Sequence, residues 1–286
     1  MKNSKYVVSK YTPTYPNSAE REYERIASLY MKEFNRIVKE NLPEVKRICE
    51  DSYNTDSRFD AKNNLIDKLC KKILNDAVKR IANSVFETMV SGIANKVQKH
   101  SLQQWTKVMK KTIGVTPDKE HYNKEFYEKI INDWIEQNKK MASDIVESSV
   151  DRMKSTIQYG IKRGESPAQI AKEMQSVMKQ TISHAKQASK DQVARLNTTI
   201  EKAHCQDCGA NDYMWMTKND SIVRECHKSF HGKIFSWNDP PEIWHIGPGK
   251  VKIMDGRRCH PGEDYRCRCI AIPVFNFRKE YEICLN

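Results

Sequence analysis

The stretch IEKAHCQDCGANDYMWM, residues 200–216, marks a change in the character of the chain. Before it, apolar residues recur at steps of three and four, as on one face of an α-helix. After Ala203 this period is lost, and short apolar runs alternate with turn-forming residues. The sequence therefore predicts a mainly α N-terminal part with long helices, followed by a small α+β C-terminal domain with short strands and long loops. We expect the two domains to span residues 1–190 and 191–286.

Charge and cysteine content follow the same division. Residues 1–200 hold 36 Lys and Arg against 25 Asp and Glu, whereas residues 201–286 hold 13 against 12. Seven of the nine cysteines lie after residue 200. Clustered basic residues can displace counterions from phosphates, although many helical proteins are simply basic. Because no groove-reading motif is present, we expect at most a weak contact with double-stranded DNA that does not depend on its sequence.

Two helical stretches are predicted in the first hundred residues. A capping-box-like start at Asn17–Glu20 opens the first, and Pro43 should kink or end it. The second carries pairs of apolar residues at steps of four between residues 65 and 94. A strict step of four drifts around a 3.6-residue helix by about 40° each time. We therefore expect this helix to break at Ser91-Gly92 or to be surrounded by several neighbours.

Further helices are predicted up to the change near residue 200. One carries apolar residues from Ala142 to Ile157 and runs out at Gly160 and Gly164. The run Ser166-Pro167-Ala168-Gln169 offers an N-cap, a proline at the first helical position and a capping-box glutamine. A separate last helix is expected after Ser183.

The C-terminal part should contain short strands and need a cross-link. Apolar runs at residues 213–216, 233–237 and 269–275 predict the strands. A segment of about 85 residues with this composition buries only a small core, so a staple is expected. No apolar run approaches the roughly 20 residues that cross a bilayer, and no apolar region follows the basic N-terminus. We therefore expect no membrane contact, and synthesis and assembly in the cytoplasm.

Cysteines and histidines supply the candidate staple, one structural zinc ion. Cys267 and Cys269 are two residues apart, which turns both thiols to the same side of an extended strand. His227 and Cys259 lie in two other segments, so a shared metal would tie distant loops together and leave no open position for water. Buried free thiols and disulfides are the other interpretations. The predicted ligands are His227, Cys259, Cys267 and Cys269, with the pair Cys205 and Cys208 as the alternative.

Catalytic signals are few. The sequence contains no Walker loop, GxGxxG, GxSxG or HExxH motif. Cys226 beside His227 could suggest a nucleophile and its base, but neighbours in sequence rarely face each other. Clustered His and Cys would also suit a zinc-scaffolded, metal-dependent nuclease acting on DNA, although the Asp-His start of an HNH-type site is missing. We therefore expect no enzymatic activity and keep the nuclease as the alternative.

An ordered series of motifs in the C-terminal part resembles a known family. The series is Trp215, Asp220, Arg224-x-x-His227, Gly232, Asp239-Pro240-Pro241, His260-Pro261-Gly262, Asp264 and Cys267-x-Cys269. It resembles the phage Mu protein F-like family of minor head proteins of tailed phages, also called head morphogenesis proteins. The resemblance covers residues 191–275 well and the helical part only in outline.

The resemblance implies a function without enzymatic activity. Proteins of this family are low-copy structural components of the virion, associated with the portal vertex and the interior of the head. The expected partners are the portal protein, the major capsid protein or scaffold, and double-stranded DNA bound non-specifically. We therefore expect a minor capsid protein that is assembled in the host cytoplasm and resides in the phage head.

Overall fold

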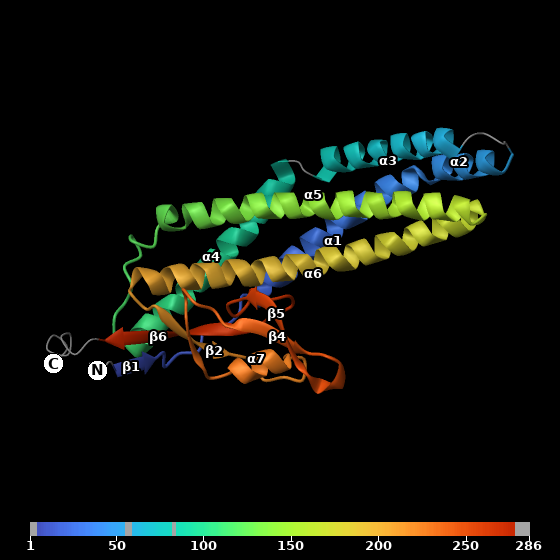
Figure 1. Ribbon diagram of the computed structural model, residues 1–286. Coiled ribbons are helices and arrows are strands. Elements are labelled where there is room, and N and C mark those ends of the chain that lie inside the picture. Colours follow the sequence, from blue (N-terminus) through green and yellow to red (C-terminus); the bar gives the residue numbers. More distant parts are fainter. Residues whose placement is uncertain (1–4, 55–58, 82–83, 278–286) are drawn as a thin grey trace. The chain divides into compact units, whose positions relative to one another are not determined.

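The computed structural model describes residues 5–54, 59–81 and 84–277 (Figure 1). Strand β1 (Lys5–Val8) comes first. The long helices are α1 (Asn17–Glu40), α2 (Leu42–Asn54), α3 (Phe59–Ile81), α4 (Ser84–Thr112), α5 (Lys124–Lys162) and α6 (Pro167–Asp207). They are followed by β2 (Asp212–Met216), α7 (Glu225–Phe230), β3 (Ile234–Ser236), β4 (Glu242–Ile246), the 3₁₀ turn η1 (Pro248–Lys250), β5 (Lys252–Arg258) and β6 (Ile270–Phe277). This order confirms the predicted fold class.

Helix boundaries follow the predicted local signals. The side-chain Oγ of Ser166 accepts the backbone N–H of Gln169 at 3.2 Å, so α6 begins with the expected cap. Between α1 and α2 the chain turns at Asn41. Pro43 lies in the first turn of α2, where its missing N–H breaks no helical hydrogen bond.

The predicted break at Ser91-Gly92 is wrong. Both residues lie inside α4, which begins at Ser84. The Ser91 hydroxyl donates to the carbonyl of Glu87 at 2.8 Å within the helix. A glycine costs a helix only about 1 kcal/mol relative to alanine, which the buried apolar residues of this helix outweigh.

The prediction of a separate helix after Ser183 is also wrong, because α6 is one helix of 41 residues. Polar residues on its buried face hide this continuity from a hydrophobic pattern. Thr181 and Ser189 are buried, and their hydroxyls donate to the carbonyls of Val177 and Lys186 in the same helix. Their polar groups are thus satisfied without ending the helix.

The chain forms two compact units. The first contains Met1–Glu20, Ile93–Trp134 and Lys190–Asn286, and the second contains Arg21–Gly92 and Ile135–Ser189. Residues near the N-terminus and in the middle of the chain therefore cluster with the C-terminal strands. The division into independently folding domains 1–190 and 191–286 stays a prediction.

The second unit is a bundle of helices around one apolar core. Its large side chains that are at most 2% exposed include Phe34, Ile37, Ile66, Ile73, Met153, Ile157 and Ile170. Within this unit α5 and α6 run side by side (Figure 1), and the hydroxyls of Ser149 and Thr181 are 2.8 Å apart. Among the described helices, none has the length and apolarity that crossing a membrane requires.

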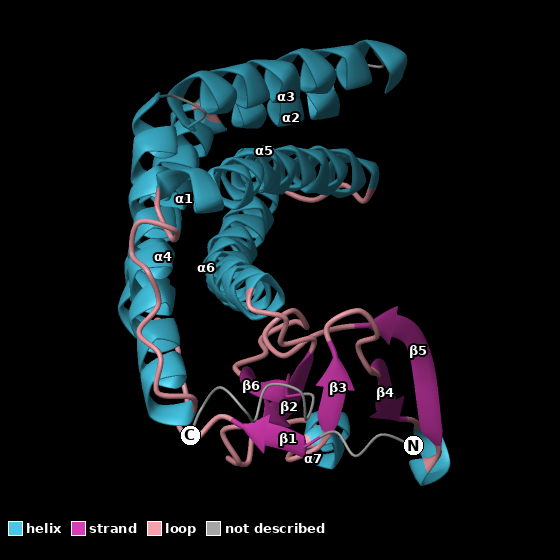
Figure 2. Ribbon diagram, turned by 90° about the vertical axis from the view of Figure 1, so that its left-hand side faces the viewer, coloured by secondary structure: helices cyan, strands magenta, loops and turns pink. Residues whose placement is uncertain are grey.

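The first unit contains an antiparallel sheet with the strand order β1-β6-β2-β3 and a separate pair, β4 and β5 (Figure 2). In β2, Tyr213 and Trp215 are fully buried, while the alternate residues Asp212, Met214 and Met216 are partly exposed. Strand β6 is central, and it pairs Val274 with Val8 of β1 and Ile272 with Met214 of β2. The segment that leads into β6 carries two of the predicted metal ligands.

Candidate metal centre

A short helix of the first unit positions His227. Helix α7 buries Cys226, His227 and Phe230, and the remaining half of the helix is exposed. The imidazole ring lies 5.2 Å from the indole ring of Trp215, centroid to centroid. Since Trp215 belongs to the central part of the sheet, β2 and α7 together fix the orientation of the histidine.

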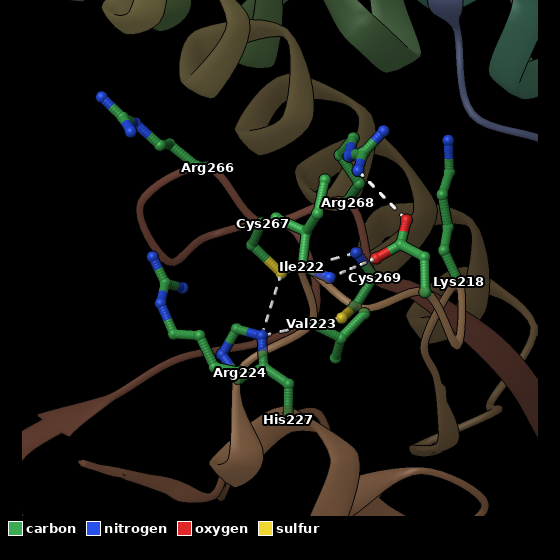
Figure 3. A pocket seen from close by; sticks show the side chains of 10 residues that line it. Lys218, Ile222, Val223, Arg224, His227, Arg266, Cys267, Arg268 and Cys269 are labelled. Atoms are coloured by element: carbon green, nitrogen blue, oxygen red, sulfur yellow. Dashed lines mark hydrogen bonds and ion pairs between the residues drawn. The ribbon is translucent and has the colours of Figure 1, made fainter. Parts of the chain in front are cut away.

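Two thiols approach the same imidazole from the segment before β6 (Figure 3). Cys267 and Cys269 are buried, and Arg268 between them is exposed, as expected for an extended chain. Both sulfur atoms lie 3.7 Å from Nδ1 of His227, and the three ligand atoms lie within 4.8 Å of one another. Within the described part of the chain, no other three side chains of these types meet this distance.

These distances fit a tetrahedral zinc ion. Zinc–sulfur and zinc–nitrogen bonds of ordinary length place the two ligand atoms about 3.6 Å apart at the tetrahedral angle. Thiolates and a neutral imidazole are also the ligands that zinc prefers among protein side chains. The three side chains therefore form a possible metal site of the His/Cys/Cys type.

Backbone N–H groups surround the sulfur of Cys267. Gly262 and Cys269 donate to it at 3.3 and 3.4 Å. Gly262 has a φ of 90°, and a Cβ at this position would come within 2.6 Å of the hydroxyl of Thr198. Only glycine fits this turn without strain. The close backbone stabilises a thiolate at Cys267, which is the form that binds a metal.

Asp264 is the acidic partner of the centre. Its side chain is 2% exposed, and Oδ2 lies 3.2 Å from Nε2 of His227. Arg224 and Arg257 contact the two carboxylate oxygens at 2.6 and 2.8 Å, and the N–H of Tyr265 donates to Oδ1 at 2.9 Å. A carboxylate on one ring nitrogen of a histidine leaves the other nitrogen as the metal ligand. Asp264 therefore directs Nδ1 of His227 towards the two sulfurs.

The same contacts set the protonation of the metal-free centre. Burial opposes charge on Asp264, but His227 and the two arginines hold its pKa well below the usual range. Burial alone would lower the pKa of His227, yet Asp264 and the neighbouring thiols raise it to about 11. Hydrogen bonding lowers the pKa of Cys267 and raises that of Cys269. These directions favour the charged forms of Asp264, His227 and Cys267 when no metal is bound, and a metal would displace protons from the centre.

The structure does not bring the other predicted ligands into this group. Cys259 follows β5, and its half-buried thiol has a pKa that burial raises to about 11. Cys205 and Cys208 lie at the end of α6 and beyond it, and the thiol of Cys208 donates to the carbonyl of Cys205 at 3.3 Å. The eight cysteines of the described residues form no disulfide. Cys284 lies outside those residues.

Sequence reasoning missed the acidic residue of the centre. It assigned no role to Asp264, although this residue stands in the motif series between Gly262 and Cys267. Cys226, which the sequence offered as a further soft ligand beside His227, is buried in α7 but lies outside the group of three. An acidic residue close to a Cys-x-Cys pair was the available signal for Asp264.

Comparison with known proteins agrees with the motifs. Residues 151–272 match the family described as phage Mu protein F like protein, and this segment contains the whole centre. The match confirms the predicted resemblance over these residues, and that family suggests a phage head morphogenesis protein. An uncharacterized protein of Haemophilus influenzae is 23% identical over 278 residues, which are 96% of this chain and 58% of that protein. The chain thus spans little more than half of that relative, and no solved structure matches it significantly.

Proposed function

We propose that this protein is a structural minor component of a tailed-phage head that acts at the portal vertex or the head interior. The observation that carries the proposal is the family match over residues 151–272. The buried centre supports it, because a site that ties α7 to the segment before β6 serves folding and needs no substrate. The expected partners are the portal protein and the major capsid protein or scaffold.

The location of the protein in particles tests this function. We expect mass spectrometry of purified phage particles to detect the protein at a few to tens of copies, and cryo-electron microscopy to place its density at the portal vertex. Particles assembled without it should have defective heads, whereas restoring the gene should restore them. Its absence from mature particles and from head precursors would contradict the proposal.

The proposal includes one zinc ion, structural in role, at His227, Cys267 and Cys269. These three side chains leave the fourth position of a tetrahedral site open, whereas the sequence predicted a closed set of four. This ligand set differs from the predicted one, because Cys259 lies outside the group. Zinc bound there would hold α7 against the chain entering β6 and add its binding free energy to that of folding. Asp264 would keep the imidazole in the ligating orientation.

The geometry does not favour the nuclease alternative. A histidine that activates water needs a free ring nitrogen directed at the substrate. In this structure Nδ1 of His227 faces two sulfurs and Nε2 faces Asp264, and the side chain is 3% exposed. His227 is therefore better suited to hold a metal than to act as a base.

Weak contact with DNA belongs to the same proposal, and helix α4 offers a surface for it. Lys99 and Lys110 are exposed and eleven residues apart, which places them on one face of the helix. We expect duplex DNA to bind with a log–log salt slope of about −0.9 for each phosphate neutralised. The double substitution Lys99→Ala/Lys110→Ala should weaken binding for all DNA sequences and reduce the slope by about 1.8.

Gel-shift titrations at several salt concentrations measure both quantities. A matched control is Lys228→Ala/Lys233→Ala, which removes the same charge from exposed positions in and after α7. Equal losses in the two variants, or binding that does not change with salt, would count against a contact through α4.

A further inference from the structure

A pocket of about 240 Å³ opens beside the metal centre (Figure 3). The imidazole of His227 and both thiols form part of its wall, and the loop 218–224 and residues 266 and 268 form the rest. Small-molecule sites usually measure about 300–1,000 Å³. This pocket is below that range, so it suits a small group rather than a large organic ligand.

The wall of the pocket is strongly basic. It contains four cationic side chains, Lys218, Arg224, Arg266 and Arg268, and one carboxylate, Asp220. Figure 3 shows Arg224 and Arg266 on one side of the opening and Lys218 on the other. Two thiolates and a zinc dication cancel in charge, so a loaded metal centre would leave this excess in place.

Two of the four cations, Arg224 and Arg268, are neutralised by carboxylates of the protein. Arg224 pairs with Asp264, and Arg268 pairs with Asp220 at 3.2 Å. The ammonium of Lys218 lies 6.0 Å from the ring centroid of Tyr15. Among the described residues, neither Lys218 nor the guanidinium of Arg266 makes an ion pair. The pocket thus presents two uncompensated positive charges.

The backbone at the pocket is held in an unusual conformation on both sides. Asn219 and Arg266 have φ values of 55° and 54°, in the left-handed region that residues other than glycine seldom adopt. Such conformations persist where the surrounding structure imposes them, often at binding sites. Here they fix the positions from which Lys218 and Arg266 extend.

From the pocket and its charges, we propose that this pocket binds a phosphate group. Arginine and lysine together recognise phosphate through charge-assisted hydrogen bonds. The volume admits one phosphate with part of an attached sugar, so the source is either a nucleic-acid backbone or a free phosphate. The inference goes beyond the proposed function and depends neither on a bound metal nor on DNA contact through α4.

Titration of the full-length protein with inorganic phosphate, followed by ³¹P NMR in a phosphate-free buffer, tests the proposal. The variant is Lys218→Ala/Arg266→Asn, because asparagine tolerates the left-handed backbone at residue 266. We expect the dissociation constant for phosphate to rise about tenfold or more in this variant, since each lost contact is charge-assisted. Both side chains are exposed, so the fold should be retained, which circular dichroism checks.

The control is Lys172→Ala/Lys179→Ala, which removes the same charge from exposed positions of α6 and should leave phosphate binding unchanged. Failure of the unaltered protein to bind phosphate, or equal weakening by both double variants, would overturn the inference. A short DNA duplex added to the phosphate complex separates the two sources. Displacement of phosphate identifies the nucleic-acid backbone, and binding of DNA without displacement identifies a free phosphate. DNA binding through α4 is measured separately by the gel-shift titrations, and its loss would not change the phosphate titration.

Discussion

Replacing Cys267 by serine is expected to remove zinc from the protein and to lower the melting temperature of the first compact unit by about 10 °C. Zinc at a thousand times its dissociation constant stabilises the folded state by about 4 kcal/mol. For a folding unit of this size each kcal/mol changes the melting temperature by about 2–4 °C. Cys267 should have the largest effect, because its sulfur contacts His227 and accepts two backbone N–H groups.

Metal analysis and calorimetry of protein purified under reducing conditions measure the two effects. Cys259→Ser is the matched control, because this cysteine lies outside the group and should leave about one zinc per chain in place. A chelator should reproduce the loss of stability in the unaltered protein and have no effect on Cys267→Ser. Zinc that is lost with Cys259→Ser but kept with Cys267→Ser would refute the ligand assignment.

Replacing Asp264 by alanine should destabilise the protein by about 3 kcal/mol, the lower end of the range for breaking a buried ion pair. Arg224 and Arg257 are about two-fifths exposed and can be solvated, whereas His227 is buried and loses its charged partner. Asp264→Asn keeps an acceptor for the imidazole and should cost less. Both changes should also weaken zinc binding by about ten- to a hundredfold.

Denaturant unfolding near neutral pH measures the cost, and Asp255→Asn is the control. Asp255 also pairs with Arg257, at 2.6 Å, but its side chain is ten times more exposed than that of Asp264. Its loss should therefore cost less than about 1 kcal/mol. Equal effects of the Asp255 and Asp264 substitutions would show that burial of Asp264 is unimportant.

The stability difference between the unaltered protein and Asp264→Asn also depends on pH. The folded protein lowers the pKa of Asp264, so the carboxylate contributes its full stability above the unfolded pKa of about 4. As the pH falls below that value towards the folded pKa, the contribution is lost. The difference between the two proteins should therefore shrink below about pH 4. A difference that stays constant under acid would contradict the role of the charge.

Local signals in the sequence predicted much of the helical part, and buried polar residues explain the main error. The cap at Ser166 correctly placed the start of α6. Its continuation through Ser183 could not be predicted, because Thr181 and Ser189 interrupt the apolar stripe yet are satisfied inside the helix. The sequence did not predict strands β4 and β5, because they bury too few apolar residues. Ile243 is the only fully buried residue that the structure describes in these two strands, so they carry no alternating pattern.

The candidate site was predictable where it depends on spacing along one strand. The two-residue step from Cys267 to Cys269 predicted that both thiols face the same way, and they do. The pairing of Asp264 with His227 depends on contacts between segments 37 residues apart, which no local pattern encodes. For the same reason the sequence could not separate Cys259 from the group.

The order of strands in the sheet has a consequence for synthesis on the ribosome. Among the described strands, β1 pairs only with β6, and β6 is made about 260 residues later. At bacterial-to-eukaryotic elongation rates this takes roughly 13 to 50 s. Cys267 and Cys269 leave the ribosome immediately before β6. A nascent chain interrupted before that point lacks both strand β6 and two of the candidate metal ligands. Premature termination therefore yields products that cannot close the sheet, and proteases can distinguish these products from finished copies.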